Sequence, residues 1–258
     1  MSKPVGRILV TNDDGIHATG LKVAIKIAKQ LSDDVWVFAP SEEQSGASHS
    51  LSLSRPVRLL KKGAKRYAVG GTPTDCVMIA TRVVMKDNPP DLIISGVNAG
   101  QNIAEDVSYS GTVAGAKEGT VFGIPSIALS QAVTLFYKRK IRFGVAEKHG
   151  ARIIRQLLKM KWDTGTLMNV NFPDIDPKDK CKTSVTIQGK RDQDIIALEE
   201  RRDPRNVPYY WYSFQRIMPN PPVQTDLAAI MRGEISITPL QMDHTNISLK
   251  RKMDKLLG

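Results

Sequence analysis

A short apolar strand that ends in two adjacent acids is the feature that most constrains this chain. Residues 8–10, Ile-Leu-Val, form an apolar run typical of a strand buried on both faces of a parallel sheet. The run ends at the turn 12–15, Asn-Asp-Asp-Gly, and apolar residues then recur at helical spacing over 21–31. A strand, a polar turn and a helix in this order indicate an α/β fold, in which ligands bind beyond the carboxyl ends of the strands.

The rest of the chain repeats this alternation of strands and helices. Further strands are predicted at 34–39, 67–70, 91–95, 124–129 and 167–171, the last of these closing the main sheet. Helical spacing is found over 76–85, 113–119 and 144–160. Glycine, serine and amide residues follow several of the strands, so the sequence predicts several polar loops at one edge of the sheet.

Length and charge narrow the function classes. The 258 residues suit one large domain, no apolar run reaches 18 residues, and the amino terminus leads directly into the first strand without a signal peptide. Cys76 and Cys181 form no metal-type pair, and a reducing cytoplasm is the expected location. The net charge of +11 is spread along the chain without aromatic–basic alternation. It therefore favours a small phosphorylated anion over a nucleic acid as the partner.

Several familiar catalytic signatures are absent from the sequence. It contains no G-x-x-x-x-G-K-[ST] loop, no G-x-G-x-x-G after the first strand and no G-x-S-x-G. The four histidines show no zinc-ligand spacing. These absences disfavour P-loop, dinucleotide-binding, serine-hydrolase and zinc chemistry.

Oxygen ligands in three strand-end loops point instead to a hard cation. They are the carboxylates of Asp13 and Asp14, the hydroxyl of Ser45 and the side-chain carbonyl of Asn98. Two adjacent carboxylates repel each other unless a cation lies against them. Carboxylate, hydroxyl and amide oxygens suit Mg²⁺, Mn²⁺ or Ca²⁺. The competing explanation is a plain turn with helix-capping acids.

A fourth loop offers a place for a phosphate group. Ser110 and Thr112 stand where a helix of small residues begins, and hydroxyls with free backbone N–H groups at a helix start can hold an anion. A simple Ser/Thr cap would use the same residues. A divalent ion beside a phosphate cradle is the minimum set for metal-assisted phosphoester hydrolysis.

Two other classes of function stay open at this point. An aspartyl-phosphate phosphatase also has acids after its first strand, but it normally separates two aspartates by one residue, whereas Asp13 and Asp14 are adjacent. A non-catalytic nucleic-acid-binding protein would explain the positive charge and would bind RNA with a steep salt dependence.

The chain changes character beyond Pro173. Residues 189–216 carry six basic and five acidic side chains with little helical or strand periodicity. Five of the fifteen aromatic residues of the chain lie between positions 209 and 214. An aromatic cluster on a polar segment favours an interface over a core. A short helix is expected at 226–231, a strand at 234–238 and a basic helix at 250–257.

Six motifs together resemble the survival protein SurE family, and the match runs in the same order from Arg7 to about Thr245. The motifs are ILVTNDDGIHATG (8–20), APSEEQSGASHS (39–50), GTPTDCV (71–77), PDLIISGVNAG (90–100), YSGTVAGAKEG (109–119) and ISITPLQMD (235–243). The resemblance implies a Rossmann-like, mostly parallel sheet with helices on both faces. It also implies a cytoplasmic, metal-dependent nucleoside monophosphate phosphatase, a 5′-nucleotidase, whose relatives also cleave 3′-nucleotides and in some cases short polyphosphate.

The resemblance also assigns roles to residues. It implies one divalent ion per subunit, held by Asp13, Asp14, Ser45 and Asn98. It places Ser110, Gly111, Thr112 and again Asn98 at the phosphate, and Asn12 beside the two aspartates among the catalytic residues. A metal-activated water, not an aspartate, is the favoured nucleophile. Family members are homodimers or homotetramers, so the single domain 1–258 is expected to use its carboxyl-terminal extension, 189–245, for subunit contacts.

Overall fold

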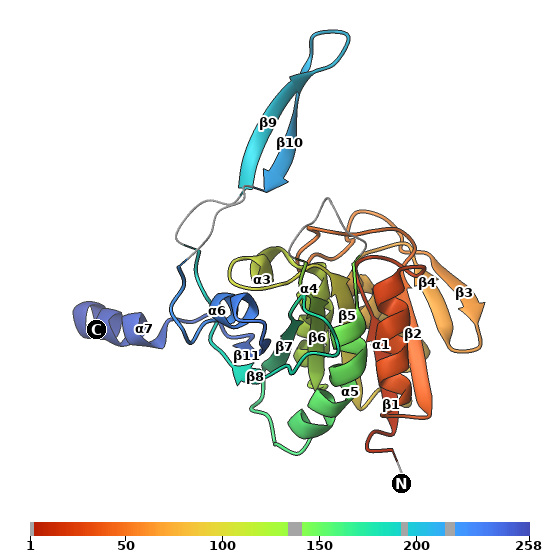
Figure 1. Ribbon diagram of the computed structural model, residues 1–258. Helices are drawn as coiled ribbons and strands as arrows, with labels where there is room; N and C mark the ends of the chain where they lie inside the picture. Colours follow the sequence, from red (N-terminus) through yellow and green to blue (C-terminus); the bar gives the residue numbers. More distant parts are fainter. Residues whose placement is uncertain (1–2, 134–140, 192–195, 215–219) are drawn as a thin grey trace.

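A computed structural model describes residues 3–133, 141–191, 196–214 and 220–258. The chain folds around one large sheet with helices on both faces, and a hairpin stands away from this body (Figure 1). No helix of the described segments is long and apolar enough to cross a membrane.

The sheet is mostly parallel. Over the described residues its strand order is β3-β4-β2-β1-β5-β6-β7-β11-β8, and only the β3–β4 and β7–β11 pairs are antiparallel. This confirms the predicted fold class. The strands in this order are β3 (Leu59–Gly63), β4 (Arg66–Val69), β2 (Asp34–Pro40), β1 (Arg7–Thr11), β5 (Leu92–Ala99), β6 (Ser126–Gln131), β7 (Thr166–Phe172), β11 (Ile235–Gln241) and β8 (Thr183–Val185).

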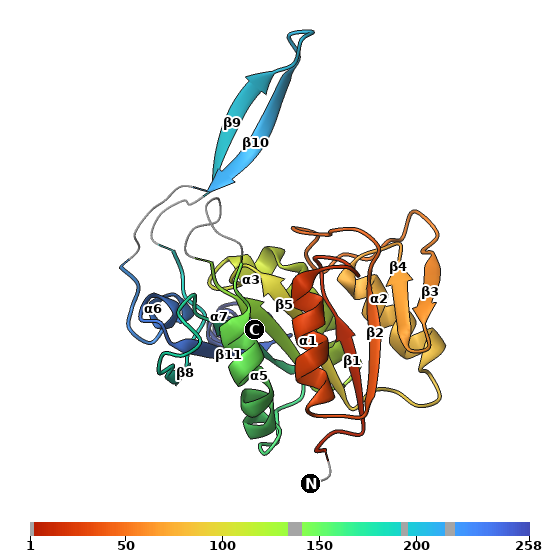
Figure 2. The same cartoon turned by 45° about the vertical axis from the view of Figure 1, so that its right-hand side comes forward.

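Helices cover both faces of the sheet (Figure 2). On one face α1 (Thr19–Lys29) packs beside α5 (Gly144–Leu157). On the other face α2 (Pro73–Ile79), continued by a π-helical turn η1 (Ala80–Val84), packs beside α4 (Gly111–Val121). Three further helices are α3 (Asp106–Tyr109), α6 (Asp226–Met231) and the carboxyl-terminal α7 (Ile247–Leu257).

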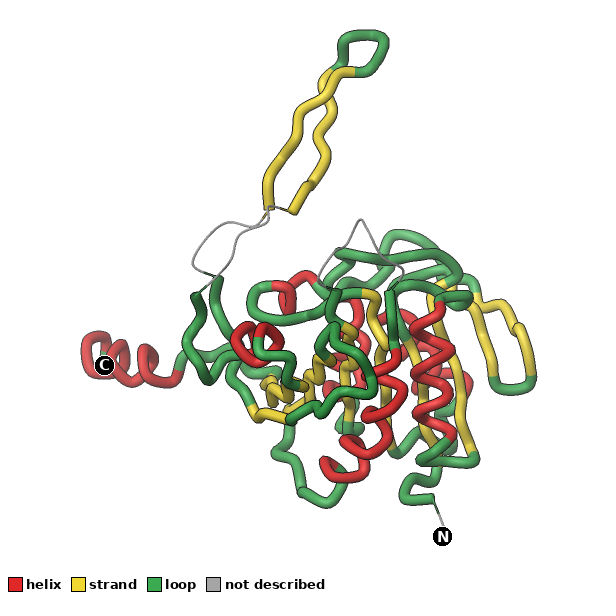
Figure 3. Tube along the Cα trace, viewed as in Figure 1, coloured by secondary structure: helices red, strands yellow, loops and turns green. Residues whose placement is uncertain are grey.

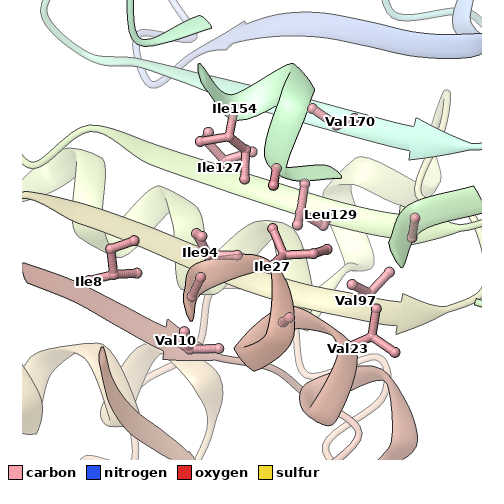
Figure 4. Packing of buried hydrophobic residues seen from close by; sticks show 14 of the residues in the cluster. Ile8, Val10, Val23, Ile27, Ile94, Val97, Ile127, Leu129, Ile154 and Val170 are labelled. Carbon is pink, nitrogen blue, oxygen red and sulfur yellow. The ribbon is translucent and has the colours of Figure 1, made fainter. Parts of the chain in front are cut away.

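Strand β1 shows why the core has two sides. Ile8 and Val10 point to the α1–α5 face, where they join the largest apolar cluster, whereas Leu9 points to the α2 face. Figure 4 shows Ile8 and Val10 in this first cluster with Ile27 of α1 and Ile154 of α5. Alternate side chains of a strand point to opposite faces, so an uninterrupted apolar run is what a strand covered on both sides requires.

The second half of the chain holds one wrong prediction and one pair of strands that the sequence did not indicate. The segment 167–171, which forms β7, does not close the main sheet, because β11 returns to pair antiparallel with it and β8 adds beyond β11. The sequence neither predicts nor excludes strands in the segment 189–216, where the structure shows β9 (Ile196–Arg202) and β10 (Pro208–Phe214) as an antiparallel hairpin. A two-stranded ribbon apart from the core buries no face, so its sequence lacks the alternation that marks a sheet strand.

Smaller differences concern element boundaries and an edge of the sheet. The alternation of Leu51, Leu53, Val57 and Leu59 predicts short strands in a hairpin off the main sheet. In the structure Leu51 and Leu53 lie in a loop, and the hairpin that follows them, β3–β4, belongs to the edge of the main sheet. Strand β11 continues through Pro239, where the sequence predicts its end. The α2 helix begins at Pro73 with Thr72 as its cap, as expected from the Thr-Pro pair.

The β9–β10 hairpin carries the aromatic cluster away from the body (Figure 3). Tyr210, Trp211 and Tyr212 are all exposed in this single chain, and the Tyr210 hydroxyl donates to Glu200 of the facing strand at 3.2 Å. The role of this hairpin in subunit contacts stays a prediction.

Candidate active site

Three neighbouring parallel strands bring the predicted site loops to one edge of the sheet. Strand β1 lies between β2 and β5 and runs parallel to both. The turn with Asp13 and Asp14 follows β1, the loop 41–50 follows β2, and Asn98 lies at the end of β5. Since the carboxyl ends of parallel strands share an edge, residues almost 90 positions apart meet here.

Asp13 packs directly against the start of α4. Its side chain is 4% exposed, and its Oδ1 accepts a hydrogen bond from the Thr112 hydroxyl. A Cβ atom added to Gly111 would lie 2.8 Å from the Asp13 Cβ and 3.0 Å from its Oδ2. Burial raises the pKa of Asp13, and the hydrogen bond from Thr112 partly opposes that rise.

Asp14 is half-buried beside Asp13, and its two carboxylate oxygens differ in their hydrogen bonding. The Ala99 backbone N–H donates to its carboxylate, which ties the β1 turn to the end of β5. In the described part of the chain, its buried Oδ2 has no hydrogen-bond partner. Burial, and then the adjacent charge of Asp13, raises the pKa of Asp14 to about 7. Such an acceptor is costly to bury alone and is suited to a cation.

Asn12 stabilises the acidic turn 12–15 through its side chain. It is fully buried, and its Nδ2 donates to the Gly15 carbonyl at 3.0 Å. Gly15 has a φ of 95°, a left-handed conformation that favours glycine. The Ile16 N–H then donates to the Pro40 carbonyl at 2.8 Å, which fixes the turn to the end of β2.

Ser45 lies in the 41–50 loop, which is anchored to the same turn. The Gln44 N–H donates to the Asp13 carbonyl at 2.8 Å. Ser45 itself is exposed, and its hydroxyl donates to Glu43 Oε1 at 2.8 Å, so its oxygen lone pairs stay available. Glu43 was not predicted as a site residue, yet its negative charge contributes to the raised pKa values of both Asp13 and Asp14.

Asn98 stands where β5 departs from regular pairing with β6. The register of the β5–β6 pair shifts between Ser95 and Asn98. Gly96 has a φ of 131°, and a Cβ atom added at this position would clash with the Leu129 carbonyl oxygen. Such an irregularity re-aims the side chains that follow it. The Asn98 Nδ2 donates to the Gly100 carbonyl at 3.0 Å, which leaves its carbonyl oxygen as the free end of the amide.

The start of α4 carries the residues that are predicted to contact phosphate. Ser110 caps the helix, its side chain accepting from the Val113 N–H at 3.0 Å, so its hydroxyl proton stays free to donate. Both the hydroxyl and the backbone N–H of Thr112 point to Asp13. Thr112 therefore braces the carboxylate in this structure, and its contact with phosphate stays a prediction.

Asp13, Asp14, Ser45 and Asn98 suit a divalent metal ion, although only two of them are acidic. Within the described segments, no group of three or more His, Cys, Asp or Glu residues is placed to hold a metal ion. A cation here would need Asp13 and Asp14 together with the neutral oxygens of Ser45 and Asn98, as the sequence predicts. Hard cations such as Mg²⁺ and Mn²⁺ accept this mixture of carboxylate, hydroxyl and amide oxygens.

The structure is thus an α/β protein whose mostly parallel sheet is covered by helices on both faces. At the carboxyl edge of this sheet, the acidic turn after β1 faces the start of the glycine-rich helix α4. A family model described as Survival protein SurE matches residues 8–194. The chain belongs to the survival protein SurE family.

Individual relatives match almost the whole chain. A protein from Parvibaculum lavamentivorans, named 5′-nucleotidase SurE, is 54% identical over 98% of this chain and 91% of its own length. One of the same name from Azorhizobium caulinodans is 56% identical over 93% of this chain and 94% of its own. The crystal structure of the SurE protein from Aquifex aeolicus superposes with a TM-score of 0.82 at 35% identity, covering 98% of this chain and all of that one.

Proposed function

We propose that this chain is a nucleoside monophosphate phosphohydrolase that works with one divalent metal ion per subunit. The observation that carries the proposal is the buried Oδ2 of Asp14, which has no hydrogen-bond partner among the described residues, beside Asp13, which accepts from Thr112 at the start of α4. The relatives named 5′-nucleotidase, at 54% and 56% identity over nearly the full chain, support the same reaction.

Asp13, Asp14, Ser45 and Asn98 would hold the metal. When bound, a divalent ion lowers the pKa of a water molecule and polarises a phosphoryl oxygen. The chain's own part is to keep these ligands in place. Thr112 donates to Asp13, the Ala99 N–H donates to Asp14, and the Gly100 carbonyl accepts from the Asn98 amide nitrogen, so the amide oxygen is the end that would bind the metal.

The phosphate would bind between this metal and the first turn of α4. The Ser110 hydroxyl and the Gly111 N–H lie at this helix start, where Gly111 packs against Asp13, and the partial positive charge of a helix start favours an anion. The close approach of Gly111 to Asp13 holds the anion donors and the metal carboxylate at a fixed separation. A net charge of +11 attracts the phosphorylated substrate from a distance.

Finer features follow the family expectation and remain part of the proposal. They are cleavage of 3′-nucleotides and short polyphosphate, action in the cytoplasm, a water nucleophile, and assembly as a homodimer or homotetramer through the 189–245 extension. The exposed aromatic side chains of β10 support the assembly.

Phosphate release from a panel of nucleoside monophosphates, with and without a chelator, tests the function. We expect release that stops with the chelator and returns with Mg²⁺ or Mn²⁺, and that is lost in Asp14→Asn. Hydrolysis that survives full metal removal would refute the metal-dependent mechanism. A trapped phospho-aspartate would favour the aspartyl-phosphate alternative, and RNA binding that survives the chelator without hydrolysis would favour the nucleic-acid alternative.

A further inference from the structure

The 41–50 loop carries Ser45, and hydrogen bonds to other segments anchor it on both sides of this residue. Close to β2 its Gln44 N–H donates to the Asp13 carbonyl. At the far end the Ser48 N–H donates to the Tyr109 carbonyl at 3.1 Å and the Ser48 hydroxyl to the Ser108 carbonyl at 2.7 Å. Between these anchors Gly46 has a φ of 76° and no neighbouring atom within 4 Å of a built Cβ. The position of Ser45 therefore depends on the anchors at Gln44 and Ser48 on its two sides.

A hydrogen bond between side chains joins the far end of the loop to α4. His49 Nε2 lies 2.8 Å from Glu118 Oε2, and the side chain of Glu118 is 6% exposed while that of His49 is 29% exposed. Among the described residues no other group is hydrogen-bonded to this carboxylate. A buried carboxylate without a partner carries a large desolvation penalty, so Glu118 strongly favours the state in which His49 is docked.

The same few residues hold both halves of the candidate site. Ser48 binds the carbonyls of residues 108 and 109, immediately before Ser110, and His49 binds the helix that Ser110 begins. The segment 48–49 thus connects the metal-side loop that carries Ser45 with the phosphate-side start of α4. A shift of this segment would move the two sides of the site relative to each other.

We propose that His49 and Glu118 are a pair of positioning residues that hold the 41–50 loop, and with it Ser45, against the metal and phosphate site. This inference rests on the proposed function for its effect on hydrolysis. Its effect on metal binding and on the order of the loop is independent of which substrate is cleaved.

Four variants and one control test the pair. They are His49→Ala, His49→Gln, Glu118→Gln and the double variant His49→Ala with Glu118→Gln. Lys26→Met is the matched control, since it removes a 2.9 Å ion pair between α1 and α5, far from the site. Each protein is titrated with Mn²⁺ by calorimetry, its 41–50 amides are followed by hydrogen exchange, and its Tm, kcat and KM are measured.

For His49→Ala we expect a Mn²⁺ Kd raised about tenfold, the size of one hydrogen bond to a charged group. The Gln44 and Ser48 amides should exchange faster, with a fall in kcat. His49→Gln keeps a donor that reaches the carboxylate and should recover most of the affinity. The double variant no longer buries an unpaired charge, so its Tm should recover while its Mn²⁺ Kd stays high. Lys26→Met should leave the Kd and the exchange unchanged.

Two results would overturn the positioning role. One is a Mn²⁺ Kd and loop exchange in His49→Ala equal to those of the parent protein. The other is a double variant whose Mn²⁺ affinity returns together with its Tm, which would make the pair a stabilising contact only. If the parent protein binds Mn²⁺ and the Kd responds as expected, but no nucleotide is hydrolysed, the proposed function fails while the positioning role stands.

Discussion

Replacing Gly111 by alanine is the sharpest test of how closely the two halves of the site are packed. The added Cβ would lie 2.8 Å from the Asp13 Cβ and 3.0 Å from Asp13 Oδ2. An ordinary contact between carbon atoms is roughly 3.8 Å, so either Asp13 or the start of α4 must move by about 1 Å. Asp13 cannot easily move away, because the nearest atom is its Cβ and because the Thr112 hydroxyl holds its carboxylate.

The expected costs differ for stability and for catalysis. Overpacking of this kind costs about 1–3 kcal/mol, which for a protein of this size lowers the Tm by about 2–12 °C. Misplacing a catalytic group by 1 Å lowers the rate by roughly 100-fold. We therefore expect a folded Gly111→Ala protein with a much lower kcat/KM at saturating metal and a weaker affinity for Mn²⁺.

The assay compares Gly111→Ala with Gly63→Ala in thermal unfolding, metal titration and nucleotide hydrolysis. At Gly63 the nearest atom to the added Cβ is the Arg66 Cβ at 3.6 Å, an ordinary contact, so this control should behave like the parent protein. A Gly111→Ala enzyme with an unchanged kcat/KM would show that Asp13 does not work at the position described here.

Three further predictions concern pH, charge and assembly. In the metal-free protein the pKa of Asp14 is about 7, above its usual 3.8, so the native state binds more protons than the unfolded chain between about pH 4 and 7. The free energy of unfolding, measured by chemical denaturation in the presence of a chelator, should therefore fall as the pH rises through this range. It should fall less steeply with pH in Asp14→Asn, and an equal pH dependence in the two proteins would contradict the raised pKa. Asn98→Asp adds a third carboxylate, worth roughly 4 kcal/mol at ~4 Å before screening, and should tighten Mn²⁺ binding while slowing hydrolysis; weaker Mn²⁺ binding in calorimetry would exclude Asn98 as a ligand. Replacing Trp211 and Tyr212 by serine should give a smaller particle in sedimentation, and an unchanged assembly would exclude these aromatics from the interface.

The sequence predicts the centre of the molecule well because local patterns specify it. An apolar run such as 8–10 needs cover on both faces, and acids directly after it must lie at the carboxyl edge of a parallel sheet. The helix cap at Ser110 is likewise a local signal, and the structure shows it. The roles of the metal and phosphate ligands stay predictions.

What sequence reasoning missed depends on contacts between distant segments. The return of β11 to β7 is a tertiary pairing with no local signature. His49 and Glu118 are 69 residues apart, and only the fold brings them within 2.8 Å. Thr112 was expected to face phosphate, whereas the packing of α4 against the β1 turn directs its hydroxyl to Asp13.

The central claim is that the β1 turn, the 41–50 loop and the end of β5 hold one divalent cation beside the start of α4. The most direct measurement is an anomalous difference map from crystals soaked in Mn²⁺ and inorganic phosphate. The account predicts one manganese peak per chain, bounded by Asp13, Asp14, Ser45 and the Asn98 side-chain oxygen, with phosphate against Ser110. A map without a peak there, or with manganese bound by neither aspartate, would contradict it.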